Sequence, residues 1–278
     1  MTHAHDGSPI DELPIFHLVK RSEEEKENNR MTTEKDPSLH HAWPKFVSLE
    51  GLIGAGKSTI VKAIADLGRP DVIVLPEPVH RWCERVIPAA NDPGGTSLLE
   101  SYYRDAKSVA MAFQMFAMLT RVQQLSDLAE DLTSGRRAGV RLVVAERCSW
   151  SDYELFGRPM RDSGLLSEAD WYVYTAWFDA VTSGRLAPPL KPDGYAYLAA
   201  SPETCLRRIG ERARPGEDGV DLAYLEALER AHAGFFEARP AGTVLGLDGD
   251  LEGPEAVVEA ARAIVDWGIG GAPPPPDN

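Results

Sequence analysis

The stretch Phe46-Val-Ser-Leu-Glu-Gly51-Leu-Ile-Gly-Ala-Gly-Lys-Ser58-Thr-Ile60 decides the fold. A short apolar run leads into the pattern GxxxxGK[ST], and an amphipathic run follows as far as Leu67. A strand, a glycine-rich turn and a helix in this order form a P-loop, which binds phosphate groups. Glycine allows the sharp turn, backbone N–H groups point at phosphate oxygens, and the helix N-terminus adds partial positive charge.

The P-loop pattern predicts a binding site for a phosphate donor. We expect the ammonium group of Lys57 to reach the β- and γ-phosphates of a nucleotide, and the hydroxyl group of Ser58 to bind Mg²⁺. The expected phosphate-binding residues are Gly51, Gly54, Ala55, Gly56, Lys57, Ser58 and Thr59. The alternative is a glycine turn without a ligand. The pattern does not identify the acceptor of the phosphoryl group.

Composition narrows the class of protein. The chain has 278 residues, of which 43% are hydrophobic, and this is ample for one α/β domain. Its net charge of −14 argues against a nucleic-acid partner. Three unclustered cysteines fit a reduced intracellular protein without disulfides or a zinc site. No apolar run is long enough to span a membrane, and no signal peptide is recognisable.

The two ends of the chain differ from its middle. Residues 1–43 are polar and contain an acidic run at 22–27, so we expect a disordered acidic tail. That acidic run disfavours a mitochondrial transit peptide, so the cytoplasm is favoured over the mitochondrion or the nucleus. Histidines 3, 5, 40 and 41 are interpreted as flexible surface residues. Residues 44–268 form the expected domain, and residues 269–278 a Pro-rich tail.

Strands and helices are expected to alternate through the domain. Strands are predicted at 45–50, 72–75, 140–145, 195–199 and 243–247. Helices are predicted at 98–132, at 167–182 with a capping box, after Ser201, at 221–236 and at 254–267. A turn with a helix start is expected at 91–96, and a loop at 157–166. This order predicts an α/β fold, a doubly wound five-stranded parallel sheet flanked by helices.

Candidate residues for the acceptor follow the second strand and line the first long helix. Glu77 lies between two prolines at a strand end, where sheets of this kind bind ligands. Tyr103, Gln114 and Arg121 fall on one stripe of the helix, and a bend near 104–106 would bring all three to one ligand. The alternatives are a solvated loop glutamate and a partly exposed polar seam.

Charged residues also follow the third strand and the later helix. Glu146, Arg147 and Asp152 lie at the carboxyl end of strand 140–145. Four arginines between 207 and 214 lie where a helix breaks into Pro and Gly, and this is typical of a lid that closes over phosphates. The alternative for these arginines is a solvated helix face that pairs with Glu211.

In combination, these motifs resemble the deoxyribonucleoside kinase family, in the branch of deoxycytidine, deoxyguanosine and deoxyadenosine kinases. The resemblance spans about residues 45–268. It is carried by Glu50-Gly-Leu-Ile-Gly-Ala-Gly-Lys-Ser-Thr59, Glu77-Pro-Val79 with Trp82, Phe113-Gln114, Arg121, Glu146-Arg147, and Ser201-Pro-Glu-Thr-Cys205 before the arginines. It implies a P-loop NTPase-like fold with an arginine-rich lid.

The resemblance also implies an activity and roles for individual residues. The γ-phosphoryl group of ATP, or of another nucleoside triphosphate, would be transferred to the 5′-hydroxyl of a deoxynucleoside in nucleotide salvage. Glu77 would be the general base, Arg147 would steady the phosphoryl group, and Glu146 would hold Mg²⁺ with Ser58. A homodimer is implied as well. For the acceptor, the resemblance implies that Tyr103 and Glu217 bind the sugar 3′-hydroxyl and that Gln114 bonds the base edge. The apolar pocket around the base would be formed by Ile53, Val79, Trp82, Leu99, Phe113 and Phe156. The lid arginines would be Arg208, Arg212 and Arg214, and the loop that meets the donor base would contain Asp248 and Asp250.

Base choice is expected to depend on Arg121 and Asp152. In the resembling family these positions face each other across the base, and members that prefer cytosine or purine nucleosides carry this pair. We therefore expect deoxyadenosine, deoxycytidine or deoxyguanosine to be preferred over thymidine.

One departure and two alternatives accompany this interpretation. The family usually has Ser after Glu-Arg, whereas this chain has Cys148, a weaker hydrogen-bonding group. A thymidylate kinase shares the P-loop, lid and sheet, but its phosphorylated acceptor requires a cation where Glu77 lies. A catalytically silent structural subunit, such as the accessory protein of respiratory complex I, would not need Lys57, Ser58 and Arg147.

Overall fold

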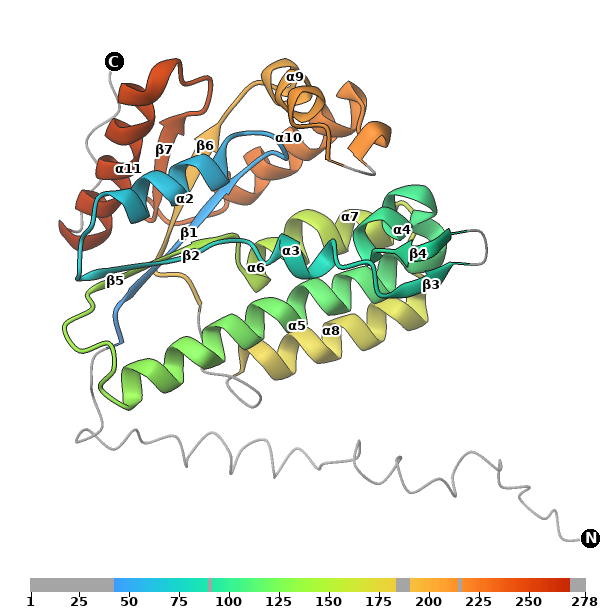
Figure 1. Cartoon of the computed structure of the whole chain (residues 1–278), viewed down its shortest axis with the longest axis horizontal. Coiled ribbons are helices and arrows are strands. Elements are labelled where there is room, and N and C mark those ends of the chain that lie inside the picture. The colour runs from blue at the N-terminus through green and yellow to red at the C-terminus, as the bar shows by residue number, and fades with distance from the viewer. Residues whose placement is uncertain (1–42, 90–91, 184–190, 215–216, 271–278) are drawn as a thin grey trace, which may run out of the picture. The chain divides into compact units, whose positions relative to one another are not determined.

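The computed structural model describes residues 43–89, 92–183, 191–214 and 217–270 (Figure 1). The tails expected at both ends of the chain, with their histidines, lie almost entirely outside these residues, so the interpretation of those segments stays a prediction. The described residues from Pro44 onward belong to one compact unit.

The central element is a sheet of five parallel strands, as predicted (Figure 1). Its order is β2 (Val72–Leu75), β5 (Leu142–Glu146), β1 (Lys45–Gly51), β6 (Gly194–Ala199) and β7 (Val244–Asp248). β1 and β5 are the most deeply buried strands, and every residue in them except Lys45 is buried. Because all strands run in one direction, their carboxyl ends meet at one edge, where ligands bind in such sheets.

Helices cover both faces of the sheet (Figure 1). α2 (Lys57–Asp66) packs against α11 (Gly253–Gly270) on one face, and α5 (Ala106–Thr133) lies on the other. The side chains of β5 alternate accordingly. Leu142 and Val144 join the apolar cluster of α2 and α11, whereas Val143 joins a cluster with Leu128 of α5. This arrangement confirms the doubly wound α/β fold.

The other helices extend this framework. α8 (Glu168–Thr182) packs along α5, and α9 (Pro202–Arg212) packs on α10 (Leu222–Glu237). The predicted capping box of α8 is present, since Ser167 and Asp170 bond each other's backbone N–H groups. Ser201 caps α9, with Pro202 at its first position, as expected. Short helices α3 (Val79–Trp82), α6 (Ser149–Ser151) and η4 (Glu217–Gly219) complete the set described.

The predicted helix 98–132 is two helices. α4 (Leu98–Arg104) ends at Asp105, whose carboxylate accepts hydrogen bonds from Ser108 and so caps α5. The break lies within the segment where a bend would bring Tyr103, Gln114 and Arg121 to one ligand. The helical assignment was right in type, and the break follows from the capping chemistry of aspartate.

Two loop assignments were wrong. Residues 92–96 form a strand, β4 (Asp92–Thr96), which pairs with β3 (Ile87–Ala89) in an antiparallel hairpin. Residues 157–166 were expected to be a loop, but a π-helical segment, η3 (Asp152–Gly157), continues into α7 (Arg158–Asp162). Gly157 is required there, since a Cβ atom would lie 2.5 Å from the ring of Tyr174.

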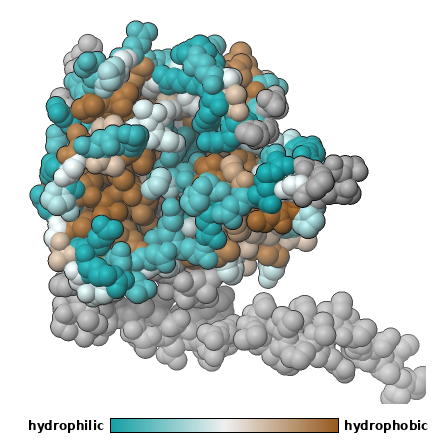
Figure 2. Space-filling model, in the orientation of Figure 1, coloured by the Kyte–Doolittle hydropathy of each residue, from teal (hydrophilic) through white to brown (hydrophobic). Residues whose placement is uncertain are grey.

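The face drawn in Figure 2 is largely hydrophilic, with separate hydrophobic patches between polar side chains. Among the helices described, none has both the length and the apolar character needed to cross a membrane.

The contact between β6 and α11 gives a test of the core. A Cβ atom at Gly194 would lie 2.4 Å from Cη2 of Trp267. Gly194→Ala should therefore lower the free energy of unfolding by about 1–3 kcal/mol, because overpacking forces rigid neighbours apart. Gly246→Ala in β7 is the matched control, because no atom lies within 4 Å of its added Cβ. Equal losses in urea unfolding would contradict this packing.

Candidate active site

A cavity of about 680 Å³ lies at the carboxyl ends of β1, β2 and β5. The P-loop forms one end of it, and α4, α5 and η3 form the other. Of the residues predicted for the site, all but Gly51, Asp248 and Asp250 line this cavity. A volume of this size accommodates a small organic ligand.

The P-loop geometry depends on two glycines in the left-handed region of backbone conformation. Gly56, with φ of 102°, precedes the first turn of α2, and Gly54 has φ of 83°. A Cβ atom at Gly54 would lie 2.6 Å from the carbonyl oxygen of Cys205, at the start of α9. Only glycine satisfies both the conformation and the close approach. The loop is thereby held against α9.

The ammonium group of Lys57 is buried within this loop. Its Nζ donates to the carbonyl oxygens of Gly51, at 3.1 Å, and of Leu52, at 2.7 Å. Burial, together with the positive charge of Arg147, lowers the pKa of Lys57 to about 8. A partly desolvated ammonium group at a helix N-terminus favours an anionic ligand.

Ser58 and Glu146 lie together at the floor of the cavity. The hydroxyl of Ser58 donates to Oε1 of Glu146 at 3.0 Å, and the other carboxylate oxygen lies 3.5 Å from the backbone nitrogen of Glu77. Within the described ranges, no group of three or more His, Cys, Asp and Glu side chains could hold a metal ion. Mg²⁺ usually takes only one or two protein oxygens, with phosphate and water completing its shell, so Ser58 and Glu146 suit this ion.

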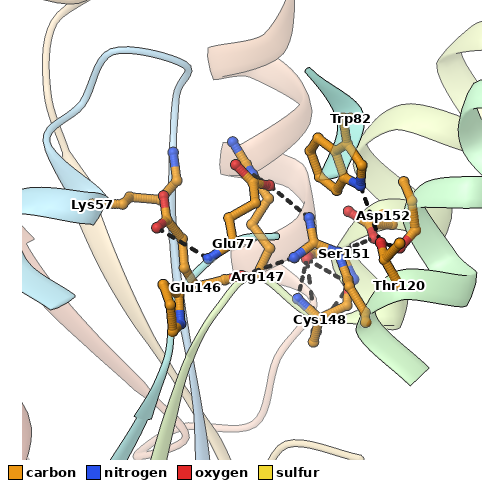
Figure 3. Close-up of polar contacts among 12 residues, drawn as sticks. Lys57, Glu77, Trp82, Thr120, Glu146, Arg147, Cys148, Ser151 and Asp152 are labelled. Atoms are coloured by element: carbon orange, nitrogen blue, oxygen red, sulfur yellow. Dashed lines mark hydrogen bonds and ion pairs between the residues drawn. The ribbon is translucent and has the colours of Figure 1, made fainter. Parts of the chain in front are cut away.

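A chain of buried charges crosses the centre of the site (Figure 3). The carboxylate of Glu77 lies 2.6 Å from Nη2 of Arg121 and 3.7 Å from Nε of Arg147. Arg121 also binds Asp152, at 2.5 Å, so the predicted pair is formed. Burial alone would raise the pKa of Glu77, but the charges of Arg121, Arg147 and Lys57 outweigh it and lower the pKa. Burial raises the pKa of Asp152 despite its arginine partner.

The backbone of Arg147 is strained. Its φ of 64° is in the left-handed region, which a non-glycine residue rarely adopts. Its Nη2 donates to the carbonyl oxygen of Gly51 at 2.8 Å, and Nη1 lies 3.3 Å from Glu50. Its guanidinium group also lies 4.8 Å from the centre of the Phe156 ring. These contacts hold the side chain in the cavity, and such strain is found at functional sites.

Glu50 is a site residue whose role the sequence did not indicate. Its carboxylate is fully buried, accepts a hydrogen bond from Ser48 at 2.6 Å, and pairs with Arg147. Burial raises its pKa. The sequence feature that could have indicated this role is a glutamate in a buried strand, directly before the P-loop. A buried carboxylate without a partner costs free energy, so Glu50 could be expected to pair with a cation.

Cys148 takes the capping position at the start of α6. Its Sγ accepts a hydrogen bond from the backbone N–H of Ser151 at 3.4 Å and lies 3.8 Å from Glu50. Burial raises the pKa of the thiol to about 12, so the group stays neutral. The local packing therefore accommodates a thiol at the position where the resembling family has a hydroxyl.

The other end of the cavity is apolar and aromatic. Phe113 packs edge-on to Trp82 at 5.5 Å and stacks on Tyr102 at 4.7 Å. Nε1 of Trp82 donates to Thr120 at 3.0 Å, which fixes the indole ring. The sequence interpretation did not include several residues that also line the cavity: Tyr102, Ala117, Met160, Leu198, Glu211, Tyr224, Gly249, Leu251, Gly253 and Val257. Most of them are ordinary apolar residues, which carry no motif.

The predicted lid arginines differ in their contacts. Arg208 donates to the carbonyl oxygens of Ala55, Gly249 and Leu251, so it joins the P-loop to the loop after β7. Arg212 and Arg214 both pair with the buried carboxylate of Glu217, at 2.8 and 3.1 Å.

The loop after β7 was predicted to meet the donor base through two aspartates. Neither lines the cavity, whereas Gly249 between them does. Asp250 accepts a hydrogen bond from the backbone N–H of Ser201, and its own N–H donates to Asp248. The aspartates therefore hold the loop in shape.

A P-loop and a carboxylate that line the same cavity are typical of a P-loop phosphotransferase with a small-molecule acceptor. Residues 47–265 match the model of the deoxynucleoside kinase family. The chain is 34% identical over 198 residues to deoxycytidine kinase of Homo sapiens, covering 68% of this chain and 74% of that protein. It is 28% identical over 194 residues to the mitochondrial deoxyguanosine kinase of Xenopus laevis, with coverage of 68% and 71%.

The chain therefore belongs to the deoxynucleoside kinase family, and it is an enzyme that phosphorylates deoxynucleosides. The prediction made from its motifs is confirmed at this level, and neither the thymidylate kinase nor the structural subunit is favoured.

Lys57 gives a test that needs no substrate. In Lys57→Met the carbonyl oxygens of Gly51 and Leu52 lose the ammonium donor, but each keeps another. Arg147 still donates to the Gly51 oxygen, and the backbone N–H of Ala55 still donates to the Leu52 oxygen. The pKa of Lys57 is about 8 in the folded protein, against 10.5 for an ordinary lysine in the unfolded chain. Between pH 8 and 10.5 the unfolded chain therefore binds more protons than the folded protein. Wild-type stability should thus rise from pH 8 to 10.5, by at most about 1.4 kcal/mol per pH unit.

Lys57→Met should lack this rise and be at least as stable as wild type at pH 7. Chemical unfolding followed at several pH values measures both effects. A parallel rise in the variant would assign the proton to another group.

Proposed function

We propose that this enzyme transfers the γ-phosphoryl group of ATP to the 5′-hydroxyl of a deoxynucleoside that carries adenine, cytosine or guanine. The observation that carries the proposal is the carboxylate of Glu77, which shares one cavity with the P-loop and lies between Arg121 and Arg147. An uncharged hydroxyl can approach that carboxylate, whereas a phosphorylated acceptor would be repelled by it. The names of the curated relatives, deoxycytidine and deoxyguanosine kinases, support this acceptor class.

The donor binds at the P-loop in this proposal. Lys57 neutralises the β- and γ-phosphates, and Ser58 and Glu146 hold Mg²⁺, which supplies charge neutralisation on the phosphate oxygens. Arg147 lies between the P-loop and Glu77, where it stabilises the transferring phosphoryl group. Another nucleoside triphosphate could replace ATP, because the contacts with phosphate do not depend on the donor base. The loop around Asp248 and Asp250 contacts that base.

Glu77 orients the acceptor hydroxyl and receives its proton. Its lowered pKa makes it a weak base, so orientation is its larger contribution, and the proton leaves late in the reaction. Tyr103 and Glu217 bind the sugar 3′-hydroxyl. Burial and the nearby charge of Glu217 raise the pKa of the Tyr103 phenol, which therefore stays a hydrogen-bond donor.

The base lies at the aromatic end of the cavity. Gln114 bonds its edge, and the apolar pocket is formed by Ile53, Val79, Trp82, Leu99, Phe113 and Phe156. Arg212 and Arg214 belong to the lid that closes over the phosphates, and Arg208 anchors the start of that lid to the P-loop.

A homodimer and a reducing compartment complete the proposal. α5 and α8 expose Leu119, Tyr172 and Val173, of which Tyr172 is 66% exposed, and burial of this surface against a second copy would remove it from water. Light scattering on the purified protein tests the dimer. All cysteines are free, which fits an intracellular location.

The role of Glu77 is tested by Glu77→Gln, which keeps size and hydrogen bonding but removes the charge. We expect kcat with ATP and deoxycytidine to fall on the order of a hundredfold, with a modest change of KM, because the negative charge that orients the hydroxyl and receives its proton is lost. Glu203→Gln, an exposed glutamate outside the cavity, is the matched control. A change in KM alone would reassign Glu77 to binding.

Nucleoside and nucleotide acceptors assayed side by side test the acceptor class.

The Arg121–Asp152 pair is tested by the double variant Arg121→Met with Asp152→Ala. A thymine carbonyl facing Asp152 leaves the buried carboxylate unpaired, at a cost of about 1–3 kcal/mol, so wild type should discriminate against thymidine by roughly tenfold or more. The double variant should lose that discrimination.

Because Arg121 also binds Glu77, the overall rate of the double variant should fall, so the ratio of kcat/KM values is the measurement. Either single change leaves one buried charge unpaired and should mainly lose activity. Equal use of thymidine and the best other substrate by wild type would show that the pair does not select the base.

A further inference from the structure

The amide group of Gln114 is held by two side chains that the proposed mechanism does not use. Its Oε1 accepts a hydrogen bond from the hydroxyl of Tyr174, and its Nε2 donates to Sδ of Met160, each at 3.3 Å. Gln114, Tyr174 and Met160 are all buried, at 3%, 0% and 6% exposure. The three residues come from α5, α8 and α7, so the contact joins three helices.

The two neighbours define the orientation of the amide. A thioether sulfur accepts hydrogen bonds and cannot donate one, so Met160 favours the NH₂ group on its side. The reversed amide would place Oε1 against sulfur, two acceptors facing each other. It would also turn the NH₂ group towards Tyr174, whose hydroxyl proton has no other acceptor in the part of the chain that the structure describes. The reversed orientation therefore loses the hydrogen bond to sulfur, and it leaves the hydroxyl proton of Tyr174 without an acceptor even if the Tyr174 oxygen accepts from the NH₂ group.

Tyr174 is held in place independently of Gln114. Its ring packs where Gly157 has no side chain, since a Cβ atom there would lie 2.5 Å from Cε1 of the ring. It also stacks with Tyr153, at 5.8 Å between ring centres. Burial raises the pKa of its phenol well above the usual value, so the hydroxyl keeps its proton. A fixed donor thus faces the amide oxygen.

We propose that Tyr174 and Met160 lock the amide of Gln114 in one orientation, and that this lock makes deoxycytidine and deoxyadenosine better substrates than deoxyguanosine. The inference rests on the proposed function, in which Gln114 bonds the base edge. Cytosine and adenine offer an amine beside a ring nitrogen that accepts, and the locked amide matches them with its acceptor and its donor. Guanine and thymine offer a carbonyl beside a ring N–H, and they require the reversed amide.

The size of the effect follows from the contacts that reversal breaks. A buried hydrogen bond contributes a net factor of roughly 2 to 12 in an equilibrium constant, and a bond to sulfur is at the weak end of that range. We therefore expect wild-type kcat/KM for deoxycytidine or deoxyadenosine to exceed that for deoxyguanosine by about three- to tenfold or more. Because the lock acts on binding of the base, the difference should lie mainly in KM.

The test compares Tyr174→Phe, Met160→Leu and a matched control, Tyr153→Phe. The first variant keeps the ring and removes only the hydroxyl, and the second keeps volume and removes the sulfur acceptor. Tyr153 belongs to the same aromatic stack but does not line the cavity. For each protein, kcat and KM are measured with ATP and each of deoxycytidine, deoxyadenosine and deoxyguanosine, and the midpoint of thermal unfolding is recorded.

The first two variants should each reduce the ratio of deoxycytidine to deoxyguanosine kcat/KM by about two- to tenfold, through KM, while Tyr153→Phe leaves it unchanged. Calorimetric titration of the two nucleosides without ATP should give the same shift in Kd. An unchanged ratio in a folded Tyr174→Phe protein, or deoxyguanosine as the best wild-type substrate, overturns the lock. If Tyr174→Phe fails to fold, an unchanged ratio of deoxycytidine to deoxyguanosine kcat/KM in Met160→Leu overturns the lock. Absence of all deoxynucleoside phosphorylation by wild type would instead overturn the proposed function.

Discussion

The rest of the site depends on the ion pairs that Glu77 forms with Arg121 and Arg147. The three residues come from the loop after β2, the middle of α5 and the end of β5, so their charges join segments that are distant in the sequence. Breaking a buried pair by removing one partner costs about 3–5 kcal/mol, because the other charge stays desolvated. The edge of the sheet and α5 are therefore held together by the same groups that would face the acceptor in the proposed function.

Opposite charges come close to balance around the cavity, with one more carboxylate than cations. Lys57, Arg121 and Arg147 face four carboxylates, those of Glu50, Glu77, Glu146 and Asp152. Burial works against every one of these ions, and the lowered pKa of Lys57 is its clearest sign. The proposed binding of a triphosphate and a divalent cation would require cations and anions close together, at a cost to the stability of the fold.

Much of this arrangement was predictable, because it is encoded locally. The P-loop, the apolar strands and the caps at Ser167 and Ser201 follow from short patterns, and parallel strands bring Glu77 and Glu146 to one edge. The errors concern segments whose structure depends on distant contacts. The segment at 92–96 is polar and glycine-rich and becomes a strand only by pairing with β3. Similarly, the helical segment at Gly157 packs against the ring of Tyr174, which occupies the space that a side chain at Gly157 would take.

The loops at the sheet edge and the helices contribute different residues to the site, and this explains why the sequence analysis missed some of them. The phosphate contacts are made by loops at the sheet edge, whose glycines and lysine form a motif. In the proposed function the base contacts come from α5, η3 and α7. Gln114 and Arg121 were predicted there from their spacing, whereas Met160 is an ordinary apolar residue that carries no pattern in the sequence. Arg121 belongs to both parts, since one guanidinium group binds Glu77 and Asp152. A change that moves Arg121 must therefore also alter the electric field at the carboxylate of Glu77. In the proposed function, base choice and rate are thus coupled through a single side chain.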